Sequence, residues 1–140
     1  MYDSFCETEI EFCNLDSIKK YLSEENQNTI IVMSKSSADR FLISDLIKSK
    51  NLLWIDSFST NPTQIDILDS LNIIKNNVKL FNKIIAIGGG SAIDLSKSIA
   101  AFYNIINENL TIEYITEKIE NKFYFNDKLD IIAIPTTAGT

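Results

Sequence analysis

Runs of apolar residues, many of them β-branched, alternate along the chain with stretches whose apolar residues recur every three or four positions. The runs have the length of strands buried on both faces, and the stretches between them have the period of amphipathic helices. Strands separated by such helices pair in parallel through right-handed crossovers. The pattern therefore predicts one α/β domain with a doubly wound, mainly parallel sheet. Its strands are expected at residues 9–12, 29–33, 52–55, 83–87 and 130–134.

The helices are predicted from apolar residues that would share one face. One of them would follow the break at Asn61-Pro62-Thr63, where Asp66 and Asp69 suit the positive N-terminal end of a helix. Another would occupy residues 37–50. The expected apolar faces are Leu15, Ile18 and Leu22; Phe41, Leu42, Leu46 and Ile47; Ile67, Leu71, Ile74 and Val78; Ala92, Leu95, Ile99 and Tyr103; and Ile112, Ile115 and Ile119.

Composition narrows the class of partner. With 45% hydrophobic and 23% charged residues the chain suits a globular domain and not a disordered one. Its formal net charge of −6 argues against nucleic acids and anionic membranes, which need clustered Lys and Arg. No apolar run approaches the length of a membrane span, and the start has no signal-peptide pattern. We therefore expect a cytoplasmic protein without a membrane or nucleic-acid partner.

The chain contains no histidine. Ser-His-Asp and Cys-His catalysis are thus excluded within these 140 residues, as is any histidine-ligated metal site. Cys6 and Cys13 match neither a CxxC pair nor zinc-ligand spacing, and are interpreted as reduced thiols. The carboxylates show no calcium-loop pattern. The sequence accordingly predicts no metal site of its own.

The most informative segment is IIAIGGGSAIDLSKSIA, residues 84–100. A strand ends, three glycines turn the backbone, and a helix begins whose free N–H groups and dipole favour an anion. This arrangement indicates a pyrophosphate site. The alternative is a turn without a ligand, in which Ser91 and Asp94 form a capping box. The spacing is neither the G-x-G-x-x-G nor the Walker pattern.

A second signal is the C-terminal IIAIPTTAGT. A buried strand ends at Pro135 and is followed by three threonines and a glycine. Such a loop offers hydrogen bonds at the carboxyl edge of a parallel sheet, where α/β proteins bind ligands.

Together these segments resemble one family. GGGSAIDLSK is similar to the GGGSxxDxAK motif of the iron-containing alcohol dehydrogenases, and IAIPTTAGT to the start of that family's PTTAGTGSE. Asn61-Pro62-Thr63 matches a third element, so the resemblance covers essentially the whole chain. It implies the Rossmann-like N-terminal domain of the dehydroquinate synthase-like superfold.

The resemblance also implies site residues. The glycine turn would hold the cofactor pyrophosphate, Asp94 would lie near the nicotinamide, and Lys97 would be a motif residue or a supporting ion-pair partner. The threonines would contact the ribose and phosphates near the nicotinamide, and Asn61 would line the adenosine side. The implied cofactor-binding set is Ser34, Lys35, Asn61, Gly89, Gly90, Ser91, Asp94, Thr136, Thr137 and Thr140.

The choice of cofactor depends on the residues after the strand at 29–33. Many NAD-using members have an acidic residue there, which hydrogen-bonds the ribose 2′-hydroxyl. This chain has Ser34 and Lys35, which remove repulsion against a 2′-phosphate and supply a cation. The sequence favours NADP, with NAD as the alternative.

The family's metal ligands, an Asp and three His, belong to a helical C-terminal domain. Residues 1–140 are thus expected to be an NAD(P)-binding domain that stops within the PTTAGT loop, with Fe²⁺ or Zn²⁺ held only in a longer parent. The parent would exchange hydride between NAD(P) and a primary alcohol or an aldehyde, and it would be able to form a homodimer. This chain alone would be inactive. Two alternatives stay open: a stand-alone nucleotide-binding module, or a relative of glycerol-phosphate dehydrogenase and dehydroquinate synthase.

Overall fold

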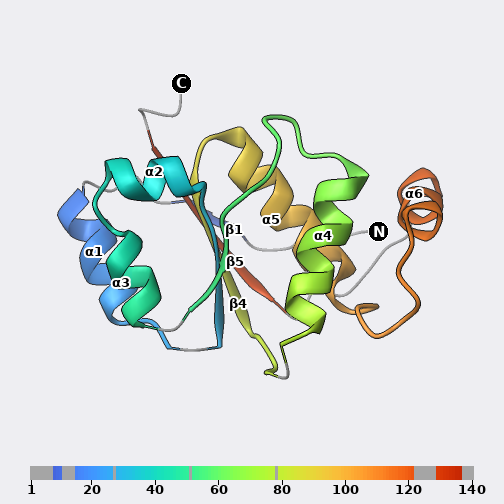
Figure 1. Cartoon of the computed structure of the whole chain (residues 1–140), viewed down its shortest axis with the longest axis horizontal. Coiled ribbons are helices and arrows are strands. Elements are labelled where there is room, and N and C mark those ends of the chain that lie inside the picture. The colour runs from blue at the N-terminus through green and yellow to red at the C-terminus, as the bar shows by residue number, and fades with distance from the viewer. Residues whose placement is uncertain are drawn as a thin grey trace.

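Five parallel strands form one sheet in the order β1-β5-β4-β2-β3. The computed structural model (Figure 1) describes residues 8–10, 15–26, 28–50, 52–77, 79–121 and 129–136. The strands are β1 (Thr8–Ile10), β2 (Thr29–Val32), β3 (Leu53–Ile55), β4 (Lys83–Gly88) and β5 (Asp130–Pro135). The doubly wound parallel sheet is confirmed. Residues 11 and 12 of the first predicted strand lie outside the described part.

Helices cover both faces of the sheet (Figure 1). Along the central strands, alternate residues enter two separate cores. Ile31 and Ile85 pack with α1, α2 and α3, whereas Ile30 and Ile84 pack with α4, α5 and α6. The helices are α1 (Leu15–Ser23), α2 (Lys35–Arg40), α3 (Ser44–Ser49), α4 (Gln64–Lys75), α5 (Gly90–Tyr103) and α6 (Ile112–Glu120).

Most of the predicted apolar faces are buried. Leu22, Leu71 and Leu95 are fully enclosed, but Ile119 of α6 stays exposed. Val78 lies outside the described residues. Among the described helices, none combines the length and the apolar character that crossing a bilayer demands.

The apolar face predicted across residues 37–50 was wrong at Leu42, whereas Phe41, Leu46 and Ile47 pack into the core as expected. The segment forms two short helices, because α2 ends in a tight reversal: Leu42 donates to the carbonyl of Asp39, and Ile43 donates to that of Ala38. Leu42 has a positive φ of 60° and is 75% exposed, while Ile43 is buried in its place. This is a Schellman ending, which glycine usually marks and leucine does not announce.

The two central strands, β2 and β4, are aligned at their starts by a buried carboxylate. Glu25 accepts hydrogen bonds from Lys83 Nζ at 3.0 and 3.1 Å and from the Thr29 hydroxyl at 3.1 Å. Thr29 pairs with Lys83 in the β2–β4 register. Because β2 and β4 are parallel and in register, their carboxyl ends lie side by side, on the upper side of the sheet in Figure 1.

Candidate functional site

A cleft of about 250 Å³ lies at the carboxyl ends of β2, β3 and β4. The chain leaves β2 for α2 on one face of the sheet and leaves β4 for α5 on the other face. Adjacent strands whose connections diverge in this way create a crevice, which is the usual ligand site of α/β sheets. The cleft is lined by Ser34, Ser37, Phe58, Ser59, Thr60, Ile87, Gly88, Gly89, Gly90, Ser91 and Ala92.

The glycine turn forms the floor of the cleft. Gly88 ends β4 with a φ of 145°, a conformation open essentially to glycine, and its carbonyl accepts the N–H of Thr136 at 3.1 Å. Gly89 is the N-cap of α5, and no side chain caps this helix. The first N–H groups of a helix lack partners within it, so those of α5 are available to an anion in the cleft.

The capping-box alternative for Ser91 and Asp94 was wrong. The N-cap is Gly89, so Ser91 already lies in the first turn of α5. Its hydroxyl donates to the carbonyl of Thr60, in the loop that follows β3. Asp94 and Lys97 are exposed on α5 outside the cleft lining, and neither forms a salt bridge within the described part of the chain.

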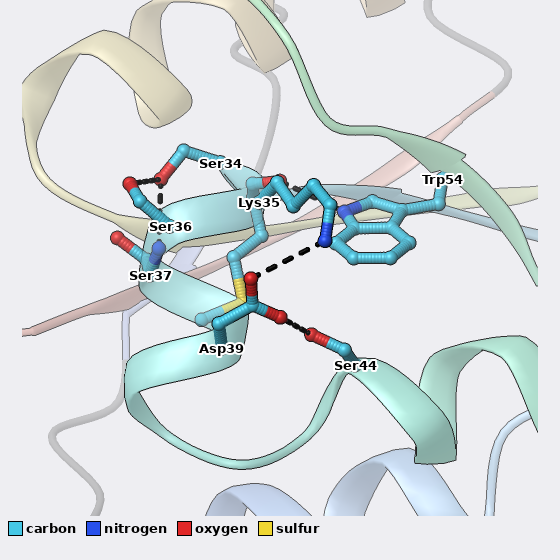
Figure 2. Close-up of polar contacts among 8 residues, drawn as sticks. Ser34, Lys35, Ser36, Ser37, Asp39, Ser44 and Trp54 are labelled. Atoms are coloured by element: carbon cyan, nitrogen blue, oxygen red, sulfur yellow. Dashed lines mark hydrogen bonds and ion pairs between the residues drawn. The ribbon is translucent and has the colours of Figure 1, made fainter.

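The start of α2 places serines at the cleft, whereas its lysine points toward Asp39 (Figure 2). Ser34 caps α2 by accepting the N–H of Ser37 at 3.2 Å, and both residues line the cleft. Lys35 Nζ instead lies 3.3 Å from Asp39 Oδ2, whose other oxygen accepts the Ser44 hydroxyl at 2.5 Å. The sequence placed Ser34 and Lys35 together; the structure brings only Ser34 to the cleft.

Hydrogen bonds favour the ionised form of the Asp39 carboxylate. The Ser44 hydroxyl and the Lys35 ammonium lower the pKa of Asp39 below its ordinary value, in that order of importance. Both partners of the Lys35–Asp39 pair are more than half exposed, so the pair contributes little stability and can separate at little cost.

The loop after β3 supplies a wall that the sequence analysis missed. Phe58, Ser59 and Thr60 line the cleft, while the predicted Asn61 is exposed beside them and does not. Their position in the sequence could have identified them, because they lie between a strand and the next helix, at the same edge of the sheet as the glycine turn.

Asp66 of α4 holds this loop. Its carboxylate accepts the N–H of Thr63 at 2.8 Å and that of Ser59 at 3.3 Å, and Thr63 caps α4 in return. Partial burial opposes ionisation of Asp66, but the hydrogen bonds from Thr63 and Ser59 outweigh it and lower the pKa.

Thr136 lies at the end of β5, beside the glycine turn. Its hydroxyl oxygen is buried and has no hydrogen-bond partner among the described residues. A buried polar atom without a partner is uncommon and calls for an explanation, of which a bound group is one. Thr137 and Thr140 lie outside the described part of the chain.

The described residues do not fit a metal centre. There is no histidine in the sequence, and the described residues contain no group of three or more Cys, Asp or Glu side chains that could hold a metal ion. The cleft instead offers backbone N–H groups and hydroxyls, which are donors for phosphate oxygens.

Comparison with known proteins identifies the family. The family model described as iron-containing alcohol dehydrogenase matches residues 9–140. The chain belongs to this family. It is 29% identical over 110 residues to a mitochondrial hydroxyacid-oxoacid transhydrogenase of Xenopus laevis, a match that covers 77% of this chain and 23% of that protein.

Solved structures agree with this assignment. A sulfoacetaldehyde reductase of Bifidobacterium kashiwanohense, in complex with NAD⁺, is 26% identical with a TM-score of 0.68 over 100% of this chain and 37% of its own. An iron-containing alcohol dehydrogenase of Thermotoga maritima shares the fold at 21% identity and a TM-score of 0.60, with 100% and 39% covered. The chain thus spans well under half the length of these relatives.

Proposed function

We propose that this chain binds the dinucleotide NAD(P) in a metal-dependent alcohol dehydrogenase. The observation that carries the proposal is the uncapped start of α5, which opens on the cleft directly after a three-glycine turn. Anions bind at such helix starts because the N–H groups and the helix dipole both favour negative charge. Family membership and the NAD⁺ complex of the sulfoacetaldehyde reductase support a dinucleotide as the anion.

Each part of the site has a proposed role. The backbone N–H groups of Gly89, Gly90 and Ser91 would donate to the pyrophosphate. The Thr136 hydroxyl, which has no partner among the described residues, would take part beside them, and Thr137 and Thr140, the next threonines in the sequence, are proposed for the same role. On the family resemblance we propose Asn61 for the adenosine side and Asp94 for the nicotinamide side, and both residues are exposed.

The bound cofactor would carry the hydride on its nicotinamide, for exchange with an alcohol or aldehyde. The chain's own contribution is to bind and orient the dinucleotide at the carboxyl edge of the sheet. Iron, or zinc in its place, would be held by residues of the longer enzyme, because those described here do not fit a metal. A stand-alone nucleotide-binding module would show the same binding without turnover; the family match over residues 9–140 favours the enzyme.

We further propose NADP over NAD. Lys35 can leave its exposed partner Asp39 at little cost and reach a 2′-phosphate near Ser34. In a calorimetric competition titration we expect NADP⁺ to bind more tightly than NAD⁺, by at most about fivefold because the contact is exposed. Lys35→Ala should abolish the difference, and the exposed Lys48→Ala should preserve it. Tighter binding of NAD⁺ by the unaltered chain would contradict this preference.

A further inference from the structure

We propose that Ser91 and Asp66 are positioning residues, which act on the dinucleotide by holding the cleft loop, residues 56–63, in place. The inference rests on the proposed dinucleotide binding. It differs from the role that the motif implies for Ser91, since the side chain would serve the wall of the cleft and only its backbone N–H would serve the phosphate.

The hydroxyl of Ser91 is already committed. A serine hydroxyl has one hydrogen to donate, and that of Ser91 donates to the carbonyl of Thr60. The phosphate oxygens of a dinucleotide accept hydrogen bonds and do not donate them, so this hydroxyl has nothing further to offer them while the contact persists. The contact joins the glycine turn to the middle of the cleft loop.

Asp66 provides the second anchor. Its Oδ1 accepts the N–H of Ser59 at 3.3 Å, and its Oδ2 accepts the N–H of Thr63 at 2.8 Å and the hydroxyl of Thr63 at 3.3 Å. Both oxygens of the carboxylate are therefore used by the loop. Because these donors stabilise the negative charge of Asp66, the carboxylate holds the loop and does not face the phosphates as a free anion.

Asp66 belongs to α4 and Ser91 to α5, two helices that pack against each other. Between these two anchors lie Ser59 and Thr60, which line the cleft with Phe58. A loop held in its bound conformation before the ligand arrives loses less conformational entropy on binding. The anchors should accordingly raise the affinity for a dinucleotide without contacting it.

The test uses Ser91→Ala and Asp66→Ala in the full chain, with Ser98→Ala on α5 and the exposed Asp69→Asn on α4 as matched controls. Amide hydrogen exchange at Ser59 and Thr60 is measured without ligand, and the affinity for NAD⁺ and NADP⁺ by calorimetry. We expect Ser91→Ala to speed exchange at these amides and to weaken binding about three- to tenfold, the effect of one lost hydrogen bond. Ser91→Thr keeps the hydroxyl and should restore both.

Asp66→Ala also removes the capping box of α4, so it should lower the melting temperature in addition. Ser91 caps no helix, and its alanine variant separates loop positioning from helix stability. Unchanged exchange at Ser59 and Thr60 in Ser91→Ala would overturn the inference, as would an unchanged affinity. If the unaltered chain binds neither dinucleotide, the proposed function fails, and the exchange rates alone then decide whether Ser91 anchors the loop.

Discussion

Gly90→Ala is expected to weaken the binding of NAD⁺ and NADP⁺ by roughly ten- to a hundredfold while the chain stays folded. Gly90 is the first residue of α5 and lines the cleft. A β-carbon built there meets no heavy atom within 4 Å apart from its chain neighbours and the adjacent backbone of its own helix, so the fold has room for the methyl group. A bound phosphate would not have room beside it. The methyl group would keep a phosphate from the neighbouring N–H groups, at a loss of about one charge-assisted hydrogen bond, roughly 1.5–3 kcal/mol.

Thermal unfolding supplies the matched measurement for Gly90→Ala. Alanine is the better helix former by about 1 kcal/mol in a helix interior, and at the first position of α5 it should leave the melting temperature unchanged or slightly raised. Calorimetric titration of the same sample gives the affinity, with Ser98→Ala as a control on the same helix. A Gly90→Ala chain that binds dinucleotides as tightly as the unaltered one would show that the ligand does not approach this turn.

Gly88→Ala should have the opposite consequence and destabilise the fold. The φ of 145° at Gly88 belongs to a region essentially restricted to glycine, and occupying it with another residue costs about 1–3 kcal/mol. A β-carbon there would also lie 3.4 Å from the β-carbon of Ala92. Because Gly88 is the buried end of the central strand β4, the turn cannot rearrange freely. We expect the free energy of unfolding to fall by about 2 kcal/mol.

Urea denaturation of Gly88→Ala measures this loss directly. The midpoint should move to lower urea at an unchanged slope, since the fold itself is the same. The neighbouring Gly90→Ala chain is the natural control, because both variants add one methyl group to the same turn. An unaltered midpoint for Gly88→Ala would mean that the φ of this residue is not required for the native turn.

The strands and most of the helices could be predicted from the sequence because their apolar residues recur with a regular period. Uninterrupted apolar runs such as residues 84–87 and 131–134 are typical of strands that are covered on both faces. The three glycines identify the turn at β4 because few other residues allow such a backbone. Both signals are local, and each depends on a handful of consecutive residues.

Contacts between distant segments could not be predicted in this way. The hydroxyl of Ser91 meets the carbonyl of Thr60, which is 31 residues away, and only the packing of α4 against α5 brings them together. The Lys35–Asp39 pair, in contrast, is local: it is an i,i+4 contact on α2 that the sequence analysis did not consider. Leu42 adopts a left-handed conformation that residue type disfavours and the burial of Ile43 enforces.

The central claim is that the glycine turn at the start of α5 holds the pyrophosphate of a dinucleotide. The most direct measurement follows the backbone amide resonances of the isotopically labelled chain during titration with NADP⁺ and NAD⁺. Saturable shifts that are largest at Gly89, Gly90 and Ser91, and accompanied by Thr136, are the predicted result. Saturable binding that leaves these amides unmoved, or no binding of either dinucleotide, would contradict it.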